Sequence, residues 1–264
     1  MESLDPYSAD PHSIIRTFFI PRHSGILIEL GISSYCLIGR PLAETLDTLS
    51  WITDLIEVMD EGPHLITDPA VFESYSQDFV IHAPYHGMNI ASLFESIRRA
   101  SVEVMIDCFA IAAEIGAPVV MHPGYHAWNT EKEAADRQFE KSLHQLQESA
   151  ADHSLMFWFE NMGELNYFHF RTPDDIPSLG DTGFCLDCGH ANLNHCLPAF
   201  LETDFSHMHI HDNDGWKDSH SAIGEGTIDF RPVMAALERT AATAVLEVKD
   251  LEGVLVSKRL LEGL

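Results

Sequence analysis

The chain has 264 residues, 45% of them hydrophobic and 9% aromatic, which is enough to bury a sizeable core. Its 41 acidic and 15 basic residues give a formal net charge of −26, which disfavours nucleic acid as a partner unless bound cations offset part of that charge. No apolar run approaches the roughly 18 residues needed to cross a bilayer, and the first residues lack a signal-peptide pattern, so we expect a cytoplasmic protein without membrane contact.

In chain order, residues 1–25 match no repeating pattern, and we expect an irregular arm there, followed by one barrel domain over 26–264. The remaining chain alternates short β-like runs with longer helical patterns, which is typical of parallel βα units. The two clearest helices are predicted over 92–116 and 130–153. Eight runs are predicted to be strands: ILIELGISS (26–34), LIEVMDE (55–61), FVIHAP (79–84), PVVMHPG (118–124), LMFWFENM (155–162), GFCLDCGH (183–190), FSHMHIHD (205–212) and AVLEV (244–248). Eight such units predict an α/β fold, a single (β/α)8 TIM barrel.

Polar side chains recur at or near the C-terminal ends of these apolar runs. Taken singly, each has an ordinary interpretation as a hydrogen-bonded structural residue, a helix cap or a solvated loop residue. Taken together they indicate a site, because the C-terminal ends of barrel strands converge on one mouth and buried polar groups need partners. A divalent metal would satisfy them. The residues are His82, His122, Glu160, Asp187, His190, His209 and Glu247.

The stretch MHIHDNDGWKDSHSAIGEG (208–226) concentrates three histidines and three aspartates in one connection. On a regular strand His207, His209 and His211 would point to the same face, so periodicity does not choose among them.

The segments IHAPYHGMNIAS, VMHPG, FENM, LDCGH, MHIHD, KDSHSAIGEG and LEV resemble, in this order, the endonuclease IV (AP endonuclease family 2) branch of the xylose isomerase-like TIM-barrel superfamily. The resemblance spans about residues 26–250 and implies a three-zinc centre. His82 and His122 would hold the first zinc, and Glu160 would bridge it to the second. Asp187, His209 and Glu247 would complete the second, and His190, Asp218 and His220 would hold the third. His211, Asp212 and Asp214 would then be loop residues or orient the ligands through hydrogen bonds.

The resemblance implies hydrolysis of a phosphodiester, with Glu160, Asp187 and Glu247 as candidate catalytic carboxylates. Imidazole and carboxylate ligands without obligatory thiolates suit Zn²⁺ best, at up to three ions, with Mn²⁺ as an alternative. Cys185 and Cys188 are interpreted as buried thiols rather than a redox pair. The implied substrate is abasic-site DNA or a small phosphorylated or sugar compound, and no obligatory protein partner is inferred. The net charge argues against DNA as the substrate. So does the small number of basic residues in the predicted mouth loops, mainly Arg40, Arg171 and Lys217.

Two alternatives remain open on the sequence. A metal-dependent sugar or sugar-phosphate isomerase or epimerase of the same superfamily would need Glu160, Asp187, His209 and Glu247, a single-metal set that can also move a proton. It would not require His82, His122, Asp218 or His220, so we favour the hydrolase. A metal-binding barrel without turnover is the third hypothesis.

Overall fold

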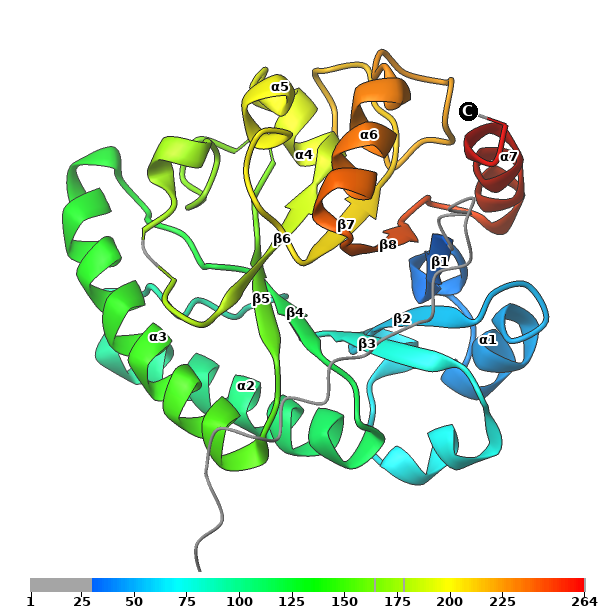
Figure 1. The fold of residues 1–264 in the computed structure, drawn as a ribbon. Coiled ribbons are helices and arrows are strands. Elements are labelled where there is room, and N and C mark those ends of the chain that lie inside the picture. Colours follow the sequence, from blue (N-terminus) through cyan, green and yellow to red (C-terminus); the bar gives the residue numbers. More distant parts are fainter. Residues whose placement is uncertain (1–29, 164, 178, 264) are drawn as a thin grey trace, which may run out of the picture.

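The computed structural model describes residues 30–163, 165–177 and 179–263, in which eight parallel strands close into a barrel (Figure 1). Each strand pairs with its neighbours in chain order, and the first pairs with the last. The strands are β1 (Leu30–Ser33), β2 (Leu55–Met59), β3 (Asp78–His82), β4 (Val119–Met121), β5 (Phe157–Glu160), β6 (Gly183–Asp187), β7 (His207–Ile210) and β8 (Thr243–Leu246). The predicted barrel is confirmed. The division into an arm and a barrel at residue 25 stays a prediction, because residues 1–29 lie outside the described ones.

Helices surround the barrel (Figure 1). They are α1 (Leu42–Leu49), α2 (Glu95–Ile115), α3 (Lys132–His153), α4 (Cys188–Leu193), α5 (Leu197–Phe200), α6 (Phe230–Thr240) and α7 (Leu251–Leu261). The two helices predicted from the sequence correspond to α2 and α3 within a few residues at each end. In the part of the chain that the structure describes, no helix is long and apolar enough to cross a membrane.

Two of the connections between strands depart from the simple βα repeat. Among the described residues, β2–β3 and β5–β6 contain only 3₁₀ turns: η2 (Gly62–His64), η3 (Pro69–Ser74) and η5 (Pro173–Asp175). Each turn has a proline in its first residues. Proline fits the start of a helical turn, because the N–H that it lacks would have no intrahelical partner there.

Below the polar side chains at the C-terminal ends of the strands, the barrel interior contains a small apolar cluster. Val80, Val120, Trp158 and Cys185 form the apolar cluster. Gly183 makes room for it, because a Cβ there would lie 2.2 Å from Trp158 Cδ1. Since side chains two residues apart on a strand share a face, the inward side of β5 continues from Trp158 to Glu160.

One predicted boundary is wrong in a way that matters for the site. The strand expected over 183–190 ends at Asp187, and α4 begins at Cys188. The Asp187 carboxylate caps this helix by accepting a hydrogen bond from the His190 backbone N–H at 2.6 Å. His190 therefore lies in the first turn of a helix rather than on a strand, but it still lies at the barrel mouth.

Candidate metal centre

The first group at the mouth consists of His82, His122 and Glu160, from the ends of β3, β4 and β5. His82 Nε2 lies 3.4 Å and His122 Nε2 lies 3.3 Å from Glu160 Oε2. His82 Nδ1 lies 3.0 Å from the carbonyl oxygen of Ala83. A carbonyl only accepts, so Nδ1 carries the proton and Nε2 is left to face the carboxylate. Ligand atoms of these three residues all lie within 4.8 Å of one another.

The second group shares Glu160 with the first and adds Asp187, His209 and Glu247, all of them buried. His209 Nδ1 stands between the carboxylates, 3.3 Å from Glu160 Oε1, 3.3 Å from Glu247 Oε2 and 3.7 Å from Asp187 Oδ2. Three carboxylates thus converge on one imidazole nitrogen. Among the described residues, neither ring nitrogen of His209 makes a hydrogen bond of good geometry.

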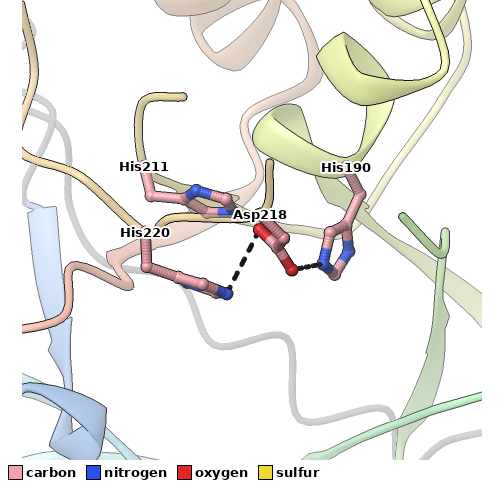
Figure 2. A group of neighbouring side chains, drawn as sticks. All are labelled: His190, His211, Asp218 and His220. Carbon is pink, nitrogen blue, oxygen red and sulfur yellow. Dashed lines mark hydrogen bonds and ion pairs between the residues drawn. The ribbon is translucent and has the colours of Figure 1, made fainter. Parts of the chain in front are cut away.

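The third group contains His190, Asp218 and His220, together with His211 (Figure 2). Asp218 lies between two histidines, with Oδ2 3.1 Å from His190 Nε2 and Oδ1 3.5 Å from His220 Nε2. His211 stacks on His220 with 4.0 Å between ring centroids, and its Nε2 lies 3.1 Å from Asp187 Oδ1. His211 therefore contacts Asp187 of the second group and is close enough to join the third.

Asp212 explains how one connection returns two side chains to the mouth. Its buried carboxylate accepts hydrogen bonds from the backbone N–H groups of Gly224, Gly226 and Ile228 at 3.0, 2.9 and 3.2 Å. Asp212 also pairs with Ser221 through backbone hydrogen bonds at 2.9 and 3.0 Å. These contacts close the loop on itself and hold the intervening Asp218 and His220 against the mouth.

Glu57 on β2 is a residue that the sequence analysis missed. It is fully buried below the second group, with Oε1 3.0 Å from His209 Nε2 and Oε2 2.9 Å from His207 Nε2. His207 Nδ1 in turn lies 2.6 Å from Thr243 Oγ1, and its ring stacks on Trp158. Burial alone would raise the pKa of Glu57, but the two histidines outweigh it and hold that pKa below its ordinary value. The only signal in the sequence is an acidic residue inside the apolar run LIEVM.

Imidazoles supply the counter-charge for the buried carboxylates. Burial lowers the pKa of His220, but its hydrogen bond to Asp218 and the charge of Glu247 outweigh burial and raise the pKa to about 9. Burial likewise opposes protonation of His190, yet Asp187 and Asp218 raise its pKa well above the usual value. Burial raises the pKa of Glu247. The raised pKa values of His190 and His220 favour protonated imidazoles in this region, where a divalent cation would supply the positive charge instead.

The orientation of the histidine rings also fits the binding of divalent metal. His190 Nδ1 lies 2.9 Å from the Asn161 carbonyl oxygen and His220 Nδ1 lies 2.8 Å from the Glu247 carbonyl oxygen, as His82 Nδ1 does with Ala83. Each contact fixes one ring nitrogen as the N–H and turns the other toward the carboxylates. A fixed N–H on one side leaves the other nitrogen to bind a metal once its proton is released, which is the arrangement that metal-binding histidines require.

The thiols at the site are poor ligands. Cys185 lies beside His207 and His209 in the barrel interior, and burial raises its pKa to about 12. Cys188 is buried as well and donates from Sγ to the His211 carbonyl oxygen at 3.6 Å. Both cysteines are free. They are therefore buried neutral thiols, in agreement with the interpretation of the sequence.

A cavity of about 660 Å³ opens onto the first and third groups and reaches Glu247. Tyr85 lines it and packs against His122 with 4.8 Å between ring centroids. Arg40, Arg171 and Lys217 do not line it, and no other lysine or arginine does among the described residues. The few basic residues noted in the sequence are thus absent from the described cavity wall.

Comparisons with known proteins concern the fold and the family of the chain. The family model described as xylose isomerase-like TIM barrel matches residues 70–259. The uncharacterized protein MJ1614 of Methanocaldococcus jannaschii is 30% identical over 233 residues, which cover 84% of this chain and 93% of the relative. The protein named probable endonuclease 4 of Mycobacterium leprae is 28% identical over 208 residues, which cover 72% of this chain and 80% of the relative. A crystal structure of a D-tagatose 3-epimerase-like protein superposes with a TM-score of 0.82 at 27% identity, and the match covers 89% of this chain and 96% of that one.

Proposed function

The chain belongs to the family of xylose isomerase-like TIM barrels, and from this premise we propose that its mouth is a multinuclear metal centre that hydrolyses phosphoesters. One observation carries the proposal. The nine side chains of the three-zinc pattern lie in three adjacent groups, of which the first two share Glu160. A single-metal enzyme has no need of the first and third groups.

The residues that would hold the ions follow from these groups. One ion would be held by His82, His122 and Glu160. A second would be held by Glu160, Asp187, His209 and Glu247, and a third by His190, Asp218 and His220. Zinc suits this mixture of imidazole and carboxylate, with manganese as the alternative. Clustered divalent ions lower the pKa of bound water and offset the charge of a phosphoryl group.

The protein's own side chains would orient the reaction. Hydrolysis breaks one P–O ester bond, joins the oxygen of water to phosphorus and delivers a proton to the departing oxygen. Glu160 faces both the first and the second group, so its carboxylate would position the attacking water. Glu247, like Glu160, lies beside His209 Nδ1, where its carboxylate would help to hold the second ion, and the attacking water would supply the proton for the departing oxygen. Asp187 would hold the second group together through His209 and His211.

We infer a small phosphoester as the substrate rather than duplex DNA. Proteins that grip a DNA backbone normally neutralise several phosphates with lysine or arginine. The described residues around the cavity include none of these, and the formal net charge is −26. A small substrate would bring its phosphoryl group directly to the metals and would need no such contacts.

A sugar epimerase is the second candidate, and a specific observation favours it. The solved structure with a TM-score of 0.82 is that of a D-tagatose 3-epimerase-like protein. Glu160 and Glu247 both contact His209 Nδ1, and two carboxylates beside one ion can move a proton between carbon atoms. This reaction would use only the second group.

Parallel assays on one preparation of zinc- or manganese-loaded protein test the proposal. Bis(p-nitrophenyl) phosphate, an abasic-site duplex and D-tagatose are offered under the same conditions. We expect hydrolysis of the phosphodiester reporter, little incision of the duplex and no sugar epimerisation. The variants His122→Ala and Asp218→Asn should lose the hydrolysis. Epimerisation that survives in both variants would overturn the proposal in favour of the single-metal enzyme.

A further inference from the structure

Part of the cavity wall is built by the loops that follow β4 and β5. Tyr125 and Phe168 form an antiparallel bridge between these loops, and the His126 backbone N–H donates to the Tyr167 carbonyl oxygen at 2.9 Å. Tyr125, Tyr167 and Phe168, here called the aromatic wall, all line the cavity that also reaches the metal groups. The wall and the candidate metal centre therefore belong to one continuous space.

Buried contacts fix the aromatic wall from behind. The Asn89 side chain accepts from the Tyr125 backbone N–H at 3.1 Å and donates to the Tyr125 carbonyl oxygen at 2.9 Å. Gly124 has a φ of +87°, and a Cβ there would lie 2.6 Å from Asn89 Oδ1, so the close approach depends on glycine. The wall is thus held in place before any ligand binds, which lowers the entropic cost of binding.

The wall presents large apolar surfaces that the fold leaves uncovered. Tyr125 and Tyr167 are each 36% exposed and Leu165 is 40% exposed. The Tyr125 and Tyr167 rings meet at 66° with 6.0 Å between centroids, so they offer both a face and an edge to a third ring. Met88 and Met162 also line the cavity, and thioethers pack well on aromatic rings.

We propose that the cavity binds a phosphoester whose organic group carries an aromatic or heteroaromatic ring. The ring lies against Tyr125 and Tyr167, and the phosphoryl group faces the metal groups. This inference rests on the proposed phosphoester hydrolysis and narrows its substrate class. A volume of about 660 Å³ suits a ligand of mononucleotide or aryl phosphate size. An abasic site, whose defining feature is the missing nucleobase, would leave the aromatic wall without an aromatic partner.

Binding of inert phosphonates to the zinc-loaded protein tests the proposal by calorimetry. Their P–C bond is not hydrolysed, so affinity is measured separately from turnover. We expect phenylphosphonate to bind about 10-fold more tightly than methylphosphonate, as ring stacking on an aromatic side chain implies. Tyr167→Ala should remove most of that preference, whereas Tyr167→Phe should keep it. Trp51→Ala removes a 91% exposed aromatic residue that does not line the cavity and should also keep it.

The outcomes separate this inference from the proposed function. Equal affinity for the two phosphonates would overturn the aromatic substrate class even if bis(p-nitrophenyl) phosphate is hydrolysed. A preference for phenylphosphonate that disappears in Tyr167→Ala would support the class even if no hydrolysis is found. If neither phosphonate binds, both the aromatic substrate class and the proposed phosphoester hydrolysis are contradicted.

Discussion

Glu57 offers a sharp test of how the barrel interior supports the candidate metal centre. Its carboxylate has one oxygen facing each of two imidazoles, His209 above and His207 beside it. In Glu57→Gln one acceptor oxygen remains, and an NH₂ group faces the other imidazole. The substitution keeps the volume and removes both the negative charge and one acceptor.

The expected cost follows from the complete burial of this group. Removing one partner of a buried charged pair costs about 3–5 kcal/mol, and we expect the lower end because His209 can release its proton and burial already lowers the pKa of His207. Loss of a partner that orients a metal-binding histidine lowers metal affinity about 10- to 100-fold. Urea unfolding of the metal-free protein measures the first quantity, and competition with a zinc chelator measures the second.

The control for Glu57→Gln is Glu44→Gln, which makes the same chemical change at an exposed position on α1. It should change the free energy of unfolding by less than about 0.5 kcal/mol and leave zinc affinity unchanged. A folded Glu57→Gln variant with wild-type zinc affinity would contradict the expected loss of affinity, because it would show that His209 needs no carboxylate next to its Nε2.

Three further predictions concern the shared carboxylate, pH and salt. Glu160→Gln should lower phosphoester turnover more than about 100-fold with an unchanged circular dichroism spectrum, and retained turnover would exclude Glu160 from the centre. Burial lowers the pKa of His169 to about 4, below its unfolded value near 6.5, so the contribution of this group to stability is full above pH 6.5 and is lost toward pH 4 by about 1.4 kcal/mol per unit. In urea titrations the pH dependence of stability should be less steep by about this amount in His169→Phe, and an identical slope would contradict the assignment. Because the net charge of −26 repels itself, the thermal midpoint should rise from about 0.1 to 1 M KCl, and a constant or falling midpoint would show that repulsion is minor.

The sequence was informative where chemistry and strand position coincide. A histidine or carboxylate at the end of each of several apolar runs predicts a shared rim, because parallel strands in a barrel all end at one mouth. His82, Glu160 and Asp187 are examples. The resemblance added Asp218 and His220, which lie on a loop and carry no periodicity of their own.

Other features depend on contacts that no local pattern contains. Glu57 resembles a solvated strand residue until β7 brings His207, 150 positions away, to its carboxylate. The β6 boundary was misplaced because capping of α4 by Asp187 overrides the apolar run before His190. Likewise, His211 reaches Asp187 and His220 only because the loop after β7 folds back on Asp212.

The same limit applies to the cavity. Its aromatic wall forms from two loops that are distant in sequence, and its lack of basic residues emerges only when the lining is assembled in space. The sequence therefore predicts which side chains gather at the barrel mouth better than it predicts the cavity surface around them, because residue types indicate ligand chemistry but not the shape of a pocket.

Anomalous diffraction from crystals of the zinc-loaded protein would locate the ions at the barrel mouth. We expect three zinc peaks per chain: one among His82, His122 and Glu160, one among Glu160, Asp187, His209 and Glu247, and one among His190, Asp218 and His220. A single peak confined to the second group, with the first and third groups empty at saturating zinc, would contradict the multinuclear centre.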